Sequence, residues 1–595
     1  MHLSNLKVCN FRNFESIDIP LSSNVVLLGE NSIGKSNLLF AIRLVLDSNL
    51  SDSTRYLKLS DFWDGCDFTQ NPQIEIHLDF ADFEKDPALV ALLTDYRTPE
   101  NPKVARLSYV FRKKTEVTDF SMNSEDYEFL VFGGSDENRA IPAIVRRRIA
   151  LDMLSALRDA EGQLSTWRNS PLRPLIEDAF SSISSHELSQ ITSEFDTVTE
   201  KMSSFQSIQD LEASLRTGIL NLSGSAQDID ARLRFAPTSS ERLLRSLSMY
   251  IDNGKRSISD ASLGSANIAL IALKLAEFEL RRRKNERNYS IVCIEEPEAH
   301  LHPQLQRSVF DKIFKHPEIN QTLILTSHSP TLAACAPLRS IVYLRSDHGG
   351  STKAYSLANL PVLDNELEDM ECYLTSTRSE LLFARGVIFV EGDSEEALLP
   401  SFANSLGINL DQLGISVCNV AGINFVPYVK LACSLGLPFS VITDWDPLDG
   451  SKLPLGINRT FGIWDAYCEI NEENKLTSEE RKEYEESTFL DFSQCWSKAG
   501  IFLNDQTFEV SMVNTPDLRD VFIGILEEQG FGRVRTNRLE SWKAGSVVDP
   551  QQLLSMVADI GKGRLSAKLA RKGCSLTPPD YIKSAIEFVV DRAKY

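Results

Sequence analysis

The chain begins with a residue pattern that binds phosphate groups. Its N-terminal region contains the complete G-x-x-x-x-G-K-S sequence Gly29-Glu30-Asn31-Ser32-Ile33-Gly34-Lys35-Ser36. This run follows a short apolar stretch, residues 25–28, and precedes a segment with apolar residues at helical spacing. A strand, a glycine-rich loop and a helix in this order predict backbone N–H groups that surround the phosphates of a nucleotide.

Each residue type in this loop has an expected role. Two glycines permit the turn, Lys35 reaches the terminal phosphates, and the Ser36 hydroxyl holds Mg²⁺. The predicted nucleotide-binding residues here are Gly29, Asn31, Gly34, Lys35, Ser36 and Asn37. The loop therefore predicts a nucleoside triphosphate, bound together with Mg²⁺.

A later pair of apolar strands supplies residues that would complete a triphosphatase site. Glu295 and Glu296 end the first strand, as a magnesium-side acid and a water-activating base should. Adjacent carboxylates at a buried strand end are costly unless a cation or a reaction requires them. His328 follows the next strand and is expected to contact the γ-phosphate. Taken alone, His328 is equally well explained as a capped strand end, and Glu296 favours the functional role.

A second cluster of acidic residues lies far along the chain. Glu391 ends an apolar strand and Glu395 begins the following helix, while Asp444 and Asp446 end another apolar strand. Residues two apart on a strand point the same way, so these carboxylates are expected to converge. Carboxylate oxygens suit Mg²⁺, Mn²⁺ or Ca²⁺ rather than zinc. Two such cations would assist phosphodiester cleavage.

Composition limits the class of protein. The 595 residues are too many for one core and predict three or four lobes, and 42% hydrophobic with 24% charged residues fits a globular protein. The net charge of -21 is not the positive charge typical of a nucleic-acid-binding protein, although basic clusters occur locally. Ten cysteines without a C-x-x-C pair argue against zinc and favour a reduced compartment. Without a signal peptide or a membrane-spanning run, we expect a cytoplasmic protein with no membrane partner.

The order of patterns predicts an α/β multidomain chain. Residues 1–145 form a first lobe with the phosphate loop, and residues 146–240 read as a helical insertion. Residues 241–350 return to the nucleotide-binding lobe. Residues 380–595 alternate strand and helix, which is typical of a parallel sheet. The acidic cluster therefore falls in a separate C-terminal domain.

The nucleotide-binding segments resemble an ABC-type ATPase of the DNA-repair and chromosome-clamp kind. The phosphate loop, residues 295–303 and residues 326–330 carry this resemblance. The run Ser262-Leu263-Gly264-Ser265-Ala266 is similar to a degenerate ABC signature. In such ATPases the signature of one subunit closes on ATP held by another. The resemblance thus implies ATP as the nucleotide, a dimer, trans contacts from Ser262 and Gly264, and a dimerisation role for the insertion; the degenerate signature leaves the strength of hydrolysis open.

The acidic cluster resembles a TOPRIM domain. The resemblance lies in two motifs that each follow an apolar strand, Glu391-Gly392-x-x-Glu395 and Asp444-x-Asp446. An ABC-type ATPase followed by TOPRIM resembles the OLD (overcoming lysogenization defect) family of nucleases, and FRNFESIDI, IEEPEAHLHP, TSHSP and VEGDSE look like that family. The resemblance implies two further catalytic groups, Glu509 and Lys562. A helix-surface lysine is the alternative for Lys562.

The resemblance implies a metal-dependent DNA endonuclease or nickase, regulated by its ATPase and assembled as a dimer or tetramer. The expected setting is prokaryotic anti-phage defence, as in Gabija-type and retron-associated effectors. The sequence leaves open a helicase-like partner or a retron reverse transcriptase with its small DNA. Two alternatives remain: a non-cleaving ATP-dependent clamp of the DNA-repair type, and a scaffold ATPase that acts through a partner. The intact acidic positions Glu391, Glu395, Asp444 and Asp446 favour the nuclease.

Overall fold

The fold of the chain is given by a computed structural model. It describes residues 1–117, 123–155, 167, 170–223, 245, 247–251, 253–315, 320–347, 349–374, 378–447, 453–572 and 577–593. The chain divides into two compact units. The first unit comprises residues 1–154, 289–298 and 302–595, and the second comprises residues 155–288 and 299–301.

The first unit begins with an antiparallel sheet in the order β2-β1-β4-β5-β6. Its strands are β1 (His2–Phe11), β2 (Phe14–Pro20), β4 (Ile74–Ala81), β5 (Ala105–Lys113) and β6 (Tyr127–Gly133). Alternating apolar residues of β4 are buried, because a strand presents successive side chains to opposite faces. One face therefore joins the core, and the other carries polar side chains.

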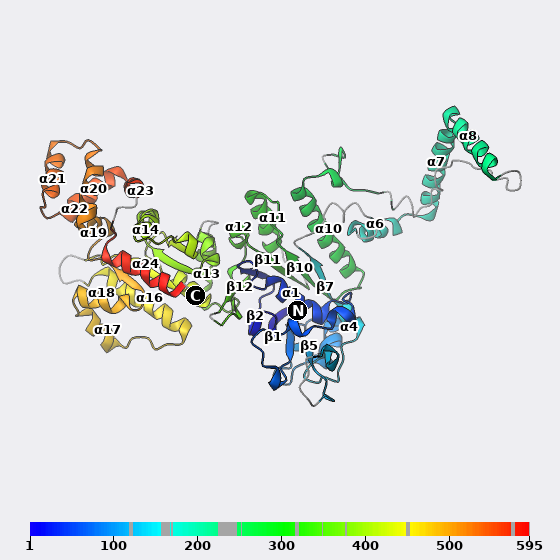
Figure 1. Cartoon of the computed structure of the whole chain (residues 1–595), viewed down its shortest axis with the longest axis horizontal. Helices are drawn as coiled ribbons and strands as arrows, with labels where there is room; N and C mark the ends of the chain where they lie inside the picture. Colours follow the sequence, from blue (N-terminus) through cyan, green and yellow to red (C-terminus); the bar gives the residue numbers. More distant parts are fainter. Residues whose placement is uncertain are drawn as a thin grey trace. The chain divides into compact units, whose positions relative to one another are not determined.

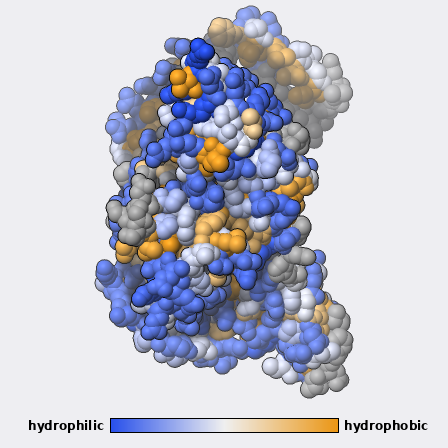
Figure 2. Space-filling model, turned by 90° about the vertical axis from the view of Figure 1, so that its left-hand side faces the viewer, coloured by the Kyte–Doolittle hydropathy of each residue, from blue (hydrophilic) through white to orange (hydrophobic). Residues whose placement is uncertain are grey.

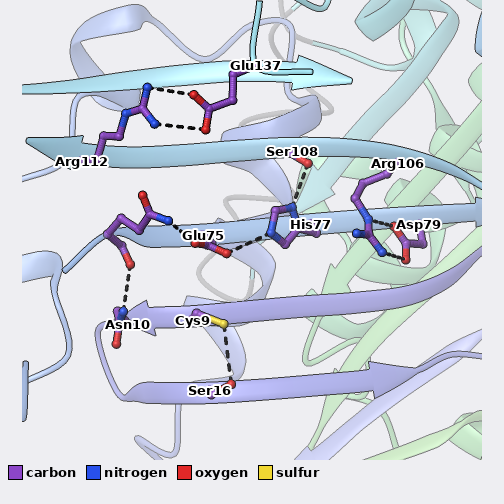
Figure 3. A network of polar contacts seen from close by, with 11 residues as sticks. Cys9, Asn10, Ser16, Glu75, His77, Asp79, Arg106, Ser108, Arg112 and Glu137 are labelled. Carbon is purple, nitrogen blue, oxygen red and sulfur yellow. Dashed lines mark hydrogen bonds and ion pairs between the residues drawn. The ribbon is translucent and has the colours of Figure 1, made fainter. Parts of the chain in front are cut away.

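Cross-strand polar contacts cover that second face (Figure 3). His77 Nδ1 lies 2.8 Å from Ser108 Oγ and its Nε2 lies 3.2 Å from a Glu75 oxygen. The composition is that of a serine triad, yet Ser108 is fully buried, so no substrate reaches its hydroxyl. Arg106 binds Asp79 through two hydrogen bonds of 2.7 and 2.8 Å. These contacts fix the register of the sheet.

The nucleotide-binding sheet has the order β13-β12-β3-β11-β10-β7. Its strands are β3 (Val25–Gly29), β7 (Ile149–Leu154), β10 (Tyr289–Glu295), β11 (Gln321–Ser327), β12 (Ile341–Ser346) and β13 (Thr352–Ser356). All neighbours are parallel except β12 and β13. Parallel pairing brings the carboxyl ends of β3, β10 and β11 to one edge. The phosphate loop therefore meets the segments that follow β10 and β11.

The C-terminal domain is built on a four-stranded sheet whose order is β15-β14-β16-β17 and whose pairs are all parallel, as the sequence predicts. The strands are β14 (Gly386–Val390), β15 (Ile415–Asn419), β16 (Phe439–Thr443) and β17 (Ile501–Leu503). Every residue of β14 and β16 is buried, which fits a parallel sheet covered on both faces.

Helices surround these sheets (Figure 1). In the ATPase part of the first unit the helices are α1 (Lys35–Leu46), α2 (Asp52–Arg55), α3 (Pro87–Leu93), α4 (Ala143–Arg148), α11 (Pro303–Lys315) and α12 (Pro330–Ala333). Those that follow are α13 (Asp364–Tyr373), α14 (Asp393–Ser405), α15 (Val426–Ser434), α16 (Leu455–Asn471), α17 (Ser478–Glu485), α18 (Phe489–Ser497), α19 (Phe508–Asn514), α20 (Pro516–Glu527), α21 (Arg533–Lys543), α22 (Pro550–Ile560), α23 (Lys562–Arg571) and α24 (Asp580–Ala593).

The second unit is mostly helical. It contains α6 (Leu172–Ser181), α7 (Ser185–Ser203), α8 (Gln206–Ser223), the short pair β8 (Tyr250–Ile251) and β9 (Arg256–Ser257), and α10 (Leu263–Arg283). Part of the predicted insertion lies outside the described residues. Helices α7 and α8 follow one another closely and leave large apolar side chains exposed: Ile191, Val198, Phe205, Leu211 and Leu215.

Among the described helices, none has the length and apolar character needed to cross a bilayer. The face shown in Figure 2 is largely hydrophilic, with apolar side chains in small groups between the polar ones.

Substitution of the central strand of the C-terminal sheet tests the importance of its burial. Phe389 in β14 is 0% exposed, so Phe389→Ala is expected to cost about 3–5 kcal/mol of folding free energy by leaving a cavity. Leu490→Ala is the control, since Leu490 is 72% exposed and should change stability by less than about 0.5 kcal/mol. Denaturant unfolding measures both. Equal midpoints for the two variants would contradict the buried position of β14.

Candidate nucleotide and carboxylate sites

The phosphate loop has the backbone conformation that its glycines permit. Gly29 and Gly34 have φ of 150° and 109°, and Cβ atoms there would lie 2.6 Å from Leu344 O and 2.1 Å from Asn13 Nδ2. Asn13 donates from that nitrogen to Ile33 O at 2.6 Å, which fixes the loop from outside. A side chain at either glycine would therefore displace the loop.

The lysine of the loop is folded onto the loop's own carbonyls. Lys35 Nζ donates to Gly29 O at 2.8 Å and to Glu30 O at 2.9 Å, and the residue is 8% exposed. Burial lowers the pKa of Lys35 to about 8, against the opposing attraction of Glu296, Glu298 and Glu30. A phosphate group would replace the two carbonyls as the partner of this ammonium and raise the pKa of Lys35.

The two sequence-distant halves of the predicted site come together. Ser36 Oγ donates to Glu295 Oε1 at 2.6 Å, so the hydroxyl and the carboxylate predicted to share Mg²⁺ already touch. Asn37 accepts from Arg12 at 2.7 Å and donates to Asn13 at 2.8 Å, which gives it a role in holding the loop. Asn31 lies exposed in the loop.

His328 and Glu296 face each other after β11 and β10. Their closest nitrogen and oxygen are 3.9 Å apart. Burial, followed by the positive charge of Lys35, lowers the pKa of His328, which favours the neutral imidazole near neutral pH. Glu296 has φ of 45°, a left-handed conformation that is uncommon for glutamate and is enriched at functional sites.

Glu298 is a residue that the sequence prediction missed. Its Oε1 accepts from Ser327 Oγ at 2.7 Å and from the His328 N–H at 2.9 Å. Its Oε2 is buried without a hydrogen bond, and burial raises the pKa of this carboxyl. The side chain thus ties the segment after β10 to the segment that carries His328. A second acid two positions after Glu296 was the available signal.

The predicted signature residues lie at the start of α10, in the second unit. Ser262 caps the helix, since its Oγ accepts from the Ser265 N–H at 3.3 Å. A Cβ at Gly264 would lie 2.6 Å from His300 O, so this position requires glycine. A trans contact of Ser262 and Gly264 with ATP remains a proposal.

In the C-terminal domain, Glu391 lies directly after β14 and is held by the end of β16. Its Oε1 accepts from the Thr443 hydroxyl at 2.5 Å and from the Asp444 N–H at 3.0 Å. Because β14 and β16 are parallel neighbours, the two carboxylates meet at the same edge of the sheet.

Burial and mutual repulsion raise the pKa of two carboxyls here. Burial is the main cause for Glu395, with Glu509 and Glu391 adding to it, and its pKa is about 7. Burial and then Glu391 raise the pKa of Asp444 to about 8, although a hydrogen bond from Asn504 opposes this. Both carboxyl groups are therefore at least partly protonated near neutral pH.

Glu509 and Lys562 are brought into the same cluster. Lys562 Nζ lies 2.9 Å from Glu509 Oε1, and Glu509 is 3% exposed. Against the cost of burial, Glu509, Asp444 and Glu395 raise the pKa of Lys562. The ammonium is therefore charged and contacts Glu509, although its side chain is 62% exposed at the start of α23, so Lys562 lies both on the helix surface and beside the carboxylates.

Arg459, in α16, is the second residue that the sequence prediction missed. Its guanidinium lies 2.5 Å from Glu391 Oε1 and 2.8 Å from Asp446 Oδ2, and its side chain is 6% exposed. It also donates to Asp444 O at 3.1 Å. A lone arginine within a helical pattern gives no sequence signal for this role.

The donor set suits a hard divalent cation. In the part of the chain that is described, no three acidic, histidine or cysteine side chains lie close enough together to hold one metal ion as they stand. Arg459 and Lys562 instead occupy the carboxylates, while Glu509 Oε2 is buried without a hydrogen bond. Carboxylate oxygens are the ligands that Mg²⁺ and Mn²⁺ prefer. The residues fit such a cation, which would compete with the two basic side chains.

Cation binding at this cluster should depend on pH. Glu395 and Asp444 have pKa values of about 7 and 8, so protons occupy them at pH 6 and must leave before a cation binds. Mg²⁺ affinity is therefore expected to rise between pH 6 and pH 8.5 and then to level off. Calorimetry in two buffers of different ionisation enthalpy measures the affinity and the protons released.

The matched control for this titration is Glu395→Gln, which should release fewer protons at pH 7 than the unmodified protein. Ser36→Ala in both proteins removes a predicted ligand of the cation at the phosphate loop. An affinity that stays constant from pH 6 to pH 8.5 would show that these carboxyls do not take part.

Comparison with known proteins gives two family matches. Residues 1–333 match a family described as an AAA ATPase domain. Residues 382–446 match the TOPRIM domain of proteins described as overcoming lysogenization defect protein-like. The first match covers more than half of the chain, and the second contains Glu391, Glu395, Asp444 and Asp446.

Similar individual proteins agree with these matches. The chain is 23% identical over 474 residues to Endonuclease GajA of Bacillus cereus strain VD045, covering 78% of each chain. It is 22% identical over 533 residues to the OLD nuclease of Thermus scotoductus, covering 86% of this chain and 91% of that protein. A solved C-terminal region of the Burkholderia pseudomallei OLD protein is 35% identical, covers 36% of this chain and 99% of that one, and gives a TM-score of 0.31.

The predicted order of an ATPase head followed by a TOPRIM domain on a parallel sheet is thus confirmed. The chain belongs to the AAA ATPase domain family, and its residues 382–446 form an OLD-like TOPRIM domain.

Proposed function

We propose that this protein is a metal-dependent DNA endonuclease or nickase whose TOPRIM site is regulated by its ATPase. The observation that carries the proposal is the convergence of Glu391, Glu395 and Asp444 beside the Glu509–Lys562 pair. Burying several carboxylates together is unfavourable unless a cation and a reaction use them. A clamp or a scaffold has no need for this arrangement, and the similar proteins are named as nucleases.

The residues of the cluster divide the work of phosphodiester hydrolysis. When bound, one or two Mg²⁺, Mn²⁺ or Ca²⁺ ions supply Lewis-acid stabilisation of the attacking and leaving oxygens. Glu391, Glu395, Asp444 and Asp446 are the proposed holders of these cations. Lys562 places a positive charge where negative charge grows on the phosphate. Water is the proposed nucleophile.

The ATP site is proposed to control this chemistry. Glu30, inside the phosphate loop, binds Arg385 through two hydrogen bonds of 2.6 and 2.9 Å. Arg385 immediately precedes β14, and β14 leads directly to Glu391. Lys35 contacts the carbonyl of the same Glu30. A phosphate that binds Lys35 would break its hydrogen bond to Glu30 O. Binding of ATP would therefore alter Glu30, the residue that contacts Arg385 of the TOPRIM domain.

Hydrolysis and assembly are further parts of the proposal. Glu296 is the proposed base that activates water at ATP, and Glu295 with Ser36 is proposed to hold its Mg²⁺. Ser262 and Gly264 are proposed to contact ATP of another subunit. The exposed apolar side chains of α7 and α8 are suited to pairing with a second copy, which supports a dimer or tetramer.

A role in anti-phage defence is the biological part of the proposal. Its support is the OLD-like TOPRIM match and the similarity to Endonuclease GajA. A helicase-like protein, or a retron reverse transcriptase with its small DNA, is the kind of partner that the family resemblance offers.

The central test is DNA cleavage by the purified protein. Supercoiled plasmid and linear DNA are incubated with Mg²⁺ or Mn²⁺, with and without ATP. We expect nicking or cutting, and Glu395→Ala should reduce the rate at least about 100-fold by removing a proposed cation ligand. Lys35→Ala should remove the effect of ATP while the cluster stays intact. The absence of metal-dependent strand breaks under every condition would favour the clamp or the scaffold.

The Glu30–Arg385 contact gives a test of regulation. Arg385→Gln removes the charge that binds the loop, so the ratio of cleavage rates with and without ATP should move toward one. ATP affinity should change less than about threefold, because this pair is partly exposed and weak. Arg535→Gln, which removes a partly exposed arginine from an ion pair with Asp559, serves as the control. An unchanged rate ratio in Arg385→Gln would exclude this route.

A further inference from the structure

The TOPRIM domain contains a second cavity that the carboxylate cluster does not use. Its volume is about 690 Å³, within the range of small-molecule sites. Aromatic side chains from α16, α17 and α18 line it, together with residues that precede β16. The rings concerned are Trp464, Tyr467, Tyr484 and Trp496.

These rings form a connected set. Trp464 stacks on Tyr467 with ring centroids 5.3 Å apart. The same ring makes an edge contact with Trp496, with ring centroids 5.6 Å apart. Tyr484 lies 5.4 Å from Trp496. Aromatic walls of this kind favour a planar ring as ligand, since stacking adds to the burial of apolar area.

The charge around the cavity favours an anion. Lys498 and Arg592 line it, and neither forms an ion pair with a carboxylate in the described part of the chain. The Arg592 guanidinium lies 3.5 Å from the centre of the Phe588 ring, which also lines the cavity. Glu473 is the acidic residue of the lining. The two cations outnumber it, so a phosphate group is the complementary partner of the aromatic walls.

The position of the cavity separates it from DNA cleavage. Gly436, Leu437 and Pro438 line it and lead into the amino end of β16, whereas Asp444 follows the carboxyl end of the same strand. Five residues of strand place roughly 15 Å between the two edges. Arg345, of the ATPase strand β12, donates to Gly436 O at 2.6 Å. The cavity thus adjoins the contact between the ATPase and the TOPRIM domain.

We propose that this cavity binds a free nucleoside monophosphate, with the base between the aromatic rings and the phosphate near Lys498 and Arg592. A base has a planar π face that matches the aromatic rings, and the phosphate matches the cations. A DNA strand is disfavoured as occupant because the lining residues Gly436, Leu437 and Pro438 precede the amino end of β16, whereas the carboxylates follow its carboxyl end. A ligand that contacts Gly436 lies next to the hydrogen bond from Arg345. A shift of β16 on binding would also move Asp444, which follows that strand.

Binding to the full-length chain tests the proposal. The Lys35→Ala background removes the phosphate-loop site, and each of the four deoxynucleoside 5′-monophosphates is titrated by calorimetry and by tryptophan fluorescence. We expect saturable binding to at least one of them with quenching of fluorescence. The corresponding nucleoside should bind more weakly, and inorganic phosphate should not quench.

Two substitutions locate the site. Trp464→Ala removes a stacking ring from the lining and should weaken binding at least about fivefold. Lys498→Glu, at an exposed position, should weaken it more than tenfold and serves if Trp464→Ala lowers the melting temperature. Trp542→Phe is the control, since Trp542 is a buried tryptophan in α21 outside the cavity lining and should leave affinity unchanged.

Three results would overturn the proposal. The first is no saturable binding of any monophosphate up to millimolar concentration. The second is equal affinity in Lys498→Glu and Trp542→Phe. The third is a single-stranded oligonucleotide that binds more tightly than every monophosphate and is weakened by Lys498→Glu, which would assign the cavity to DNA. None of these readouts requires cleavage, so they remain valid whether or not the nuclease function holds.

Discussion

The repulsion between buried carboxylates at the ends of β14 and β16 is the constraint on which the C-terminal domain depends. Parallel pairing forces Glu391 and Asp444 to the same edge, and Glu395 follows at the start of α14. Without cations this arrangement would push the strands apart. Arg459 and Lys562 offset this repulsion, because Arg459 binds Glu391 and Asp446 and Lys562 binds Glu509. The basic side chains thus keep the acidic residues assembled.

The ATPase site uses the same principle with the charges reversed. There the buried Lys35 donates hydrogen bonds to backbone carbonyls, and the negative charges of three glutamates oppose the lowering of its pKa by burial. Both sites hold a charged group in an environment that a ligand would improve. Their connection through Glu30 and Arg385 is short, because β14 itself spans the distance from the domain contact to Glu391.

Residues in strand-end motifs were predictable from the sequence, whereas residues that act through tertiary contacts were not. Gly29 to Ser36, Glu295 and the TOPRIM acids follow apolar strands, so their edge positions could be derived from periodicity, and Glu509 and Lys562 came from family resemblance alone. Arg459 reaches the cluster from α16, and its helical neighbours carry no pattern that distinguishes it. Glu298 was visible in the motif, but its hydrogen bonds to Ser327 and His328 depend on the pairing of β10 with β11.

The ATPase sheet has a consequence for synthesis of the chain on the ribosome. Strand β3 pairs with β11 and β12, which lie about 300 residues later, so the phosphate loop cannot be supported until residue 346 has emerged. At roughly 5–20 residues per second this delay lasts about 15–60 s. The TOPRIM acids and Lys562 are made later still. The order of translation therefore completes the strands of the ATPase sheet before Glu391, Asp444 and Lys562 have been made.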